Sequence, residues 1–273
     1  KTYLHPTSNE WVVFVHGAGG SSSIWFKQIK AYRQHFNLLL VDLRGHGKSN
    51  PFIKELISNR YTFKAVTADI LKVLDHLKIT SAHFVGMSLG TIIVRNLAEM
   101  STGRVKSMVL GGAVTRLNTR SQVLVKLGNL CKHIVPYMWL YSLFAYIVMP
   151  QRTQKESRHL FIREAKKLCQ KEFKRWFILT ADVNPMMRYF KERELPIPTL
   201  YLMGERDYMF IRPVKEMVAA HQKSTLLEIP DCGHVCNVER PEEFNQHSIA
   251  FIKQQAITLS LIHISEPTRP QCI

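Results

Sequence analysis

The sequence predicts an α/β fold in which a mostly parallel, doubly wound sheet carries helices on both faces. Short apolar runs rich in β-branched residues end in glycine-containing turns, and amphipathic helical patterns separate these runs along the chain. The 273 residues are 46% hydrophobic and 21% charged, a composition typical of an ordered globular protein. This length suits one large domain that carries an insertion.

Strand and helix patterns alternate at both ends of the chain. The expected strands are Trp11–Val15, Asn37–Val41, Ala82–Val85, Val105–Leu110, residues 198–203 and residues 226–229. Apolar residues spaced by three and four predict helices over residues 24–36, 62–77, 91–100 and 241–254. We therefore expect residues 1–113 and 196–258 to form the sheet-containing core.

The alternation fails between residues 114 and 195, where only helical patterns occur, so we expect a helical cap or lid there. The run Ile134–Met149 has no charge, but its sixteen residues fall short of the about 20 that span a bilayer. We expect a pocket-lining helix, with Trp139 and Phe144 contacting substrate. The second half of the insertion is strongly basic.

Ser88 lies between Gly86 and Gly90, directly after a predicted strand and directly before a predicted helix. This G-x-S-x-G pattern in this context predicts a nucleophile elbow, in which strained backbone dihedrals present the serine hydroxyl above the strand end. A serine needs a base within hydrogen-bond reach, and the base needs an orienting carboxylate. Asp207 and His234 each follow a later predicted strand, so both should lie on the same edge of the sheet as Ser88.

Five motifs between residues 10 and 255 resemble those of the α/β-hydrolase family: HGAGG at 16–20, DLRGHGKS at 42–49, GMSLG at 86–90, GERD at 204–207 and GHVCNVERPEEF at 233–244. The resemblance implies that Ser88 is the nucleophile, Asp207 the orienting acid and His234 the general base. It also implies an oxyanion hole formed by the backbone N–H groups of Leu89 and Ala18. Gly19 is the less favoured donor.

We also expect Gly19 and Met87 to contact substrate, and His16 to brace the glycine-rich loop. The resulting expectation is a cofactor-independent serine hydrolase that cleaves moderately apolar carboxylic esters through an acyl-enzyme. Hydrolysis of a carbon–carbon bond, a lactone or a thioester by the same triad stays open, as does a small-molecule-binding protein on this fold. A serine nucleophile disfavours haloalkane dehalogenase and epoxide hydrolase activity.

Cys232 and Cys236 flank His234 and raise the question of a zinc site. No fourth ligand is evident, and a metal on His234 would occupy the nitrogen needed as base, so we predict no metal. The five cysteines are scattered, which favours a reducing, cytoplasmic location. The net charge of +16 suits peripheral contact with an anionic membrane, whereas no motif indicates specific nucleic-acid binding.

The end of the sequence differs in character from the rest. Leu259–Arg269 (LSLIHISEPTR) resembles a translated sequencing-library adaptor. We therefore predict that residues 259–273 are not native to the protein and exclude them from the fold.

Overall fold

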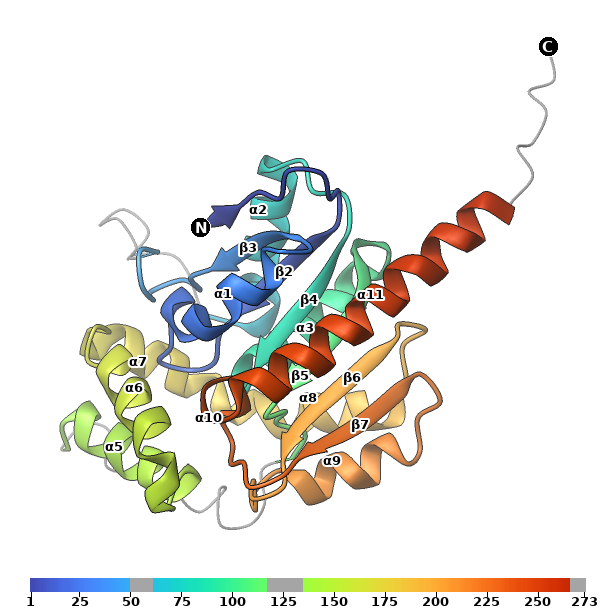
Figure 1. Cartoon of the computed structure of the whole chain (residues 1–273). Coiled ribbons are helices and arrows are strands. Elements are labelled where there is room, and N and C mark those ends of the chain that lie inside the picture. Colours follow the sequence, from blue (N-terminus) through green and yellow to red (C-terminus); the bar gives the residue numbers. More distant parts are fainter. Residues whose placement is uncertain (50–60, 117–134, 266–273) are drawn as a thin grey trace.

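A computed structural model describes residues 1–49, 61–116 and 135–265 (Figure 1). Its centre is a seven-stranded sheet with the order β1-β3-β2-β4-β5-β6-β7. The strands are β1 (Thr2–Tyr3), β2 (Trp11–Val15), β3 (Asn37–Val41), β4 (Ala82–Met87), β5 (Val105–Gly111), β6 (Thr199–Gly204) and β7 (Ser224–Ile229). Only β1 pairs antiparallel, so the predicted mostly parallel sheet is confirmed.

Alternate side chains of the central strands enter two separate apolar clusters. In β2, Val13 and Val15 belong to one cluster, whereas Val12 and Phe14 belong to the other. This division follows from the two-residue period of a strand. Because both faces of the central sheet are covered, β2 and β3 are almost entirely apolar.

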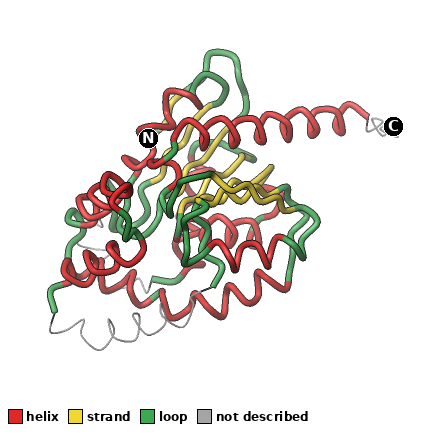
Figure 2. The backbone as a smooth tube through the Cα atoms, turned by 60° about the horizontal axis from the view of Figure 1, so that its bottom comes forward, coloured by secondary structure: helices red, strands yellow, loops and turns green. Residues whose placement is uncertain are grey.

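Helices flank both faces of the sheet, as Figure 2 shows for the strands and helices together. The core helices are η1 (Ser22–Trp25), α1 (Phe26–Tyr32), α2 (Phe63–His76), α3 (Leu89–Met100), η3 (Thr102–Arg104), α9 (Ile211–Val218), α10 (Cys236–Glu239) and α11 (Pro241–Ser265). Trp25 and Phe244 place η1 and α11 over one cluster. Ile70, Ile92 and Val214 place α2, α3 and α9 over the other.

The described part of the insertion is helical, and we call it the cap. It contains α5 (Tyr137–Val148), η4 (Arg152–Gln154), α6 (Lys155–Ala165), α7 (Gln170–Ile178) and α8 (Thr180–Glu192). The helices α5, α6 and α7 form a group to one side of the sheet (Figure 1). Residues 117–134 lie outside the described residues, so the predicted boundary near residue 114 stays a prediction, as does motion of the cap as a lid.

The cap is hydrogen-bonded to loops that follow β2 and β3. The Ser21 hydroxyl donates to Glu164 of α6 over 2.7 Å, and the Trp176 indole of α7 donates to the Arg44 carbonyl over 3.1 Å. Both Glu164 and Glu172 of the cap are buried. The cap is basic overall, yet buried acidic side chains form part of its contact with the core. The overall charge of the cap does not indicate this feature.

Helix α5 buries Tyr141, Ala145 and Val148, which lie on one face of the helix. Trp139 is 74% exposed and Phe144 is 37% exposed. Within the described part of the chain, no helix combines the length and apolarity needed to cross a membrane.

Three elements differ from the sequence prediction. The short edge strand β1 and helix α9 were not predicted, and α11 continues to Ser265 rather than ending near residue 254. The far end of α11 extends away from the sheet (Figure 1). The proposed non-native origin of residues 259–273 stays a prediction, and residues 266–273 lie outside the described chain.

Candidate active site

Ser88 occupies the sharp turn between β4 and α3. Its φ of +53° and ψ of −121° are unfavourable for a residue with a side chain and cost about 1–3 kcal/mol. Two hydrogen bonds hold the turn: the Ser88 N–H donates to the Gly111 carbonyl over 3.0 Å, and the Thr91 N–H donates to the Ser88 carbonyl over 2.9 Å. The predicted nucleophile elbow is present, with Ser88 only half-buried.

Glycines make this turn possible because backbones approach one another closely around it. A Cβ on Gly90 would overlap the carbonyl oxygens of Val15 and His16. A Cβ on Gly17 would lie 3.0 Å from the Ser88 Cβ and 3.6 Å from the Leu89 nitrogen. The loop after β2 therefore packs directly against Ser88.

His234 connects Ser88 to Asp207. Its Nε2 lies 2.9 Å from the Ser88 Oγ, and its Nδ1 lies 2.8 Å from Asp207 Oδ2. A neutral ring that donates from Nδ1 to the carboxylate accepts the serine proton at Nε2. His234 is 3% exposed and Asp207 is 2% exposed, so water is largely excluded from both side chains.

The loop that carries His234 is fixed by Glu239. Glu239 Oε2 accepts the Gly233 N–H over 2.7 Å, and its Oε1 accepts the Val235 N–H over 3.2 Å. The two amides flank His234 in the chain. Glu239 therefore positions His234, a role that sequence analysis missed.

Two buried histidines hold the loop formed by residues 16–20. The His16 Nε2 accepts the Leu43 N–H over 3.0 Å, and the His46 Nε2 accepts the Gly19 N–H over 3.1 Å. Their Nδ1 atoms face the Gly17 and Arg44 carbonyls. These contacts require neutral rings, and burial lowers the pKa of both, to about 3 for His46. His16 thus braces the loop as predicted.

The loop and the start of α3 carry the two backbone N–H groups that are predicted to form the oxyanion hole. Leu89 is the first residue of α3, where N–H groups have no partner within the helix. The Gly19 N–H is already used by His46, which leaves Ala18 as the donor that the loop can supply. The oxyanion-hole role of the Ala18 and Leu89 amides stays a prediction.

The predicted substrate contacts are only partly brought together. Met87 is 2% exposed and packs in the sheet cluster with Phe14 and Phe244, so it is a packing residue rather than an open contact. Gly19 is buried, and the Tyr141 hydroxyl lies where its Cβ would be. The exposed Trp139 and Phe144 have no described contact with the triad, so their substrate role stays a prediction without structural support.

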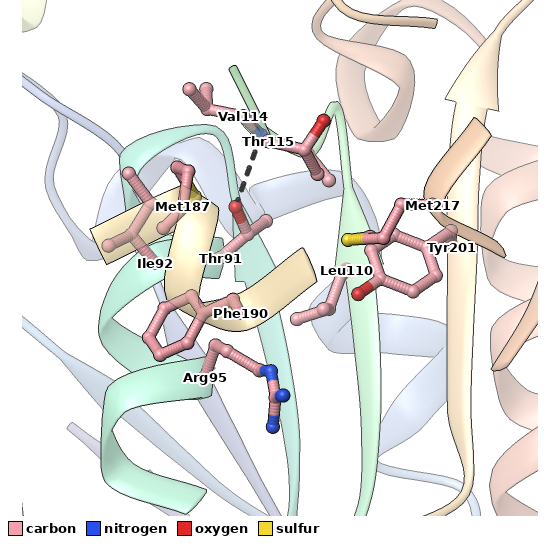
Figure 3. Close-up of a pocket in the computed structure, with 11 residues that line it drawn as sticks. Thr91, Ile92, Arg95, Leu110, Val114, Thr115, Met187, Phe190, Tyr201 and Met217 are labelled. Atoms are coloured by element: carbon pink, nitrogen blue, oxygen red, sulfur yellow. Dashed lines mark hydrogen bonds between the residues drawn. The ribbon is translucent and has the colours of Figure 1, made fainter. Parts of the chain in front are cut away.

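A small cavity lies beside α3, with Thr91, Arg95, Val114, Phe190, Tyr201 and Met217 among its lining residues (Figure 3). Its volume of about 20 Å³ holds one water molecule at most. Arg95 is engaged there: it donates to the Arg193 carbonyl and stacks on Phe190 at 5.0 Å. The cavity is too small for a substrate chain.

No metal site accompanies the triad in the residues described. No group of three or more His, Cys, Asp or Glu side chains could hold an ion in those parts of the chain. Cys232 and Cys236 are buried free thiols, and burial raises the pKa of each above its ordinary value. Thiols of this kind are unreactive packing groups.

Comparison with known proteins agrees with this geometry. A family model described as the alpha/beta hydrolase fold matches residues 10–130, which include β2 to β5 and the nucleophile elbow. The chain is an α/β-hydrolase-fold protein. The family predicted from the five sequence motifs is confirmed.

The chain is also similar to individual known proteins over most of its length. It is 25% identical over 258 residues to 3-oxoadipate enol-lactonase 1 of Acinetobacter baylyi, covering 91% of this chain and 90% of that protein. The solved enol-lactonase of Burkholderia xenovorans has a TM-score of 0.77 at 21% identity, covering 93% and 95%. A thermophilic esterase of Thermogutta terrifontis has a TM-score of 0.76 at 18% identity, covering 93% of each chain.

Proposed function

We propose that this protein is a serine hydrolase that cleaves carboxylic ester bonds through an acyl-enzyme intermediate. The observation that carries the proposal is the continuous hydrogen-bonded line from Asp207 through His234 to the half-buried Ser88. The strained elbow supports the proposal further. We propose that the Leu89 and Ala18 amides supply the oxyanion hole that acyl transfer also requires.

The proposed reaction has two halves. Ser88 attacks the ester carbonyl while His234 Nε2 takes the hydroxyl proton, and the Leu89 and Ala18 amides stabilise the oxyanion. His234 then gives this proton to the departing alkoxide, which leaves as an alcohol and forms the acyl-serine. A water molecule, deprotonated by His234, attacks the acyl-serine, and the returned proton regenerates Ser88 as the carboxylic acid leaves.

The side chains of the cap support the proposal that the substrate is moderately apolar. Tyr141, Phe161 and Phe173 form an aromatic group next to the glycine-rich loop, with Tyr141 and Phe161 stacked at 4.7 Å. Aromatic rings beside the loop that packs against Ser88 favour an apolar acyl or alcohol part. We propose no cofactor for this chemistry.

Lactone hydrolysis is the second candidate, and the relatives named as enol-lactonases favour it. A lactone is a cyclic ester, so the same residues perform the same steps, and the alkoxide stays tethered to the acyl group. The residues of the triad do not distinguish the two substrates.

The proposal is tested with p-nitrophenyl esters from acetate to laurate and with a panel of lactones. We expect turnover of at least one class and its loss in Ser88→Ala. Ser101→Ala, at the opposite end of α3, is the matched control and should retain activity. A folded protein without turnover in either class, or full activity in Ser88→Ala, would overturn the proposal.

A further inference from the structure

We propose that Tyr141 of the cap is a positioning residue for the oxyanion hole, so that the hole is complete only when α5 is seated on the glycine-rich loop. The inference rests on the proposed function and extends it to a residue outside the five motifs.

Tyr141 contacts the loop directly. Its hydroxyl donates to the Ala18 carbonyl over 2.8 Å, and its ring lies where a side chain on Gly19 would be. Gly19 has a φ of +68°, which suits glycine and leaves this space open for the ring. Tyr141 is 5% exposed, and burial raises the pKa of its hydroxyl well above the ordinary value, so the group remains a donor.

This bond completes the restraint of both peptide groups around Ala18. In the Ala18–Gly19 peptide, Tyr141 binds the carbonyl and His46 accepts the N–H. In the Gly17–Ala18 peptide, the carbonyl accepts the Gly20 N–H over 3.1 Å and lies 2.8 Å from His16 Nδ1. Rotation at Ala18 would break one of these bonds, and this restraint fixes the direction of the Ala18 N–H.

Tyr141 is itself held by two other cap helices. Its ring stacks on Phe161 of α6 at 4.7 Å and meets the edge of Phe173 of α7 at 6.2 Å. The other restraints on Ala18 come from the core, whereas Tyr141 belongs to the cap. Displacement of the cap would therefore break the hydrogen bond to the Ala18 carbonyl, and the Ala18–Gly19 peptide would keep its bond to His46.

Tyr141→Phe removes one oxygen atom and tests this role. We expect kcat to fall about five- to thirty-fold with little change in KM, because a misdirected donor weakens the transition state more than the bound ester. Tyr137→Phe is the matched control: its hydroxyl, on the same helix, donates to the Leu168 carbonyl within the cap over 2.6 Å. It should leave kcat within about two-fold of the unaltered protein.

The rate at which a fluorophosphonate labels Ser88 gives a second readout that needs no known substrate. The phosphoryl oxygen of the adduct occupies the oxyanion hole, so we expect labelling of Tyr141→Phe to slow while that of Tyr137→Phe does not. Phe161→Leu keeps the hydroxyl but removes the stacked ring, and should slow labelling by a smaller factor. Phe161→Leu therefore still tests the proposal if Tyr141→Phe folds poorly.

The outcomes separate the two proposals. Equal labelling rates in the unaltered protein, Tyr141→Phe and Phe161→Leu would overturn the role of Tyr141 and leave the proposed function intact. A rate that falls equally in Tyr137→Phe would also overturn it, because the effect would then be general loosening of the cap. Absence of labelling in the unaltered protein would overturn the proposed function and this inference with it.

Discussion

His234 Nε2 lies 2.9 Å from Ser88 Oγ, although 146 residues separate them in the chain. The sheet creates this proximity, since β4 precedes Ser88 and β7 precedes the His234 loop. Asp207, after β6, completes the line through a 2.8 Å contact. Three strand ends therefore assemble the proposed base, nucleophile and acid.

Asp207→Asn tests the role of the acid. The amide has nearly the same shape but can donate to Nδ1, which stabilises the tautomer that cannot accept the serine proton. We expect kcat to fall by about four orders of magnitude with a folded protein, measured on the best ester or lactone substrate. Asp231→Asn, at an exposed position in the loop after β7, is the control and should be near normal. A loss below ten-fold in Asp207→Asn would contradict the assignment.

Gly90→Ala tests whether close backbone approach fixes the elbow. Its methyl group would overlap the Val15 and His16 carbonyl oxygens, so we expect destabilisation by about 1–3 kcal/mol or more in denaturant unfolding. Gly103→Ala is matched to it, since nothing lies within 4 Å of the added Cβ. Equal unfolding midpoints for the two variants would show that the elbow tolerates a side chain.

His46 makes stability depend on pH. Burial, the largest cause, lowers the pKa of His46 to about 3, against an ordinary value of 6.5. Between these values the unfolded chain binds a proton that the folded chain excludes, so this contribution is fully present above pH 6.5 and is lost as pH falls toward 3. We expect the free energy of unfolding to decrease over this range.

His46→Gln tests whether His46 causes this pH dependence, because the glutamine amide oxygen can still accept the Gly19 N–H. Unfolding of this variant should show a shallower dependence on pH between 6.5 and 3. An unchanged slope would exclude His46 as its source.

Cys232→Ser and Cys236→Ser test the absence of a metal role. Both thiols are buried, so we expect a stability loss of about 1–3 kcal/mol from the added hydroxyl, with kcat largely retained. EDTA should not change the activity of the unaltered protein. Inactivation by chelator, reversed by zinc, would return His234 to the role of metal ligand.

The sequence predicts the central strands well, for a physical reason. Trp11–Val15 and Asn37–Val41 are confirmed at their predicted bounds because burial on both faces makes each run almost entirely apolar. The two-residue β1 has no such pattern. Helix α9 was missed because Pro213 interrupts its helical pattern in the sequence. The helix tolerates Pro213 because this residue lies in the first turn, where a backbone N–H has no partner within the helix.

The proximity of Ser88, His234 and Asp207 was predictable because each residue lies in a local motif, whereas contacts of the cap were not. Every residue of α5 is uncharged, so the sequence contains no polar face that would indicate its orientation. We expected Trp139 and Phe144 at the site, but the structure places Tyr141 against the loop and leaves Trp139 mostly exposed. The contact between His46 and Gly19 likewise joins two loops and has no local signal.

The central claim is that Ser88 forms a covalent intermediate, and peptide mass spectrometry after fluorophosphonate treatment tests it most directly. We predict one adduct, on the peptide that contains Ser88, with no adduct in Ser88→Ala and strongly reduced labelling in His234→Ala. A folded protein that remains unlabelled, or an adduct on another residue, would contradict the account and favour a protein that binds small molecules on this fold.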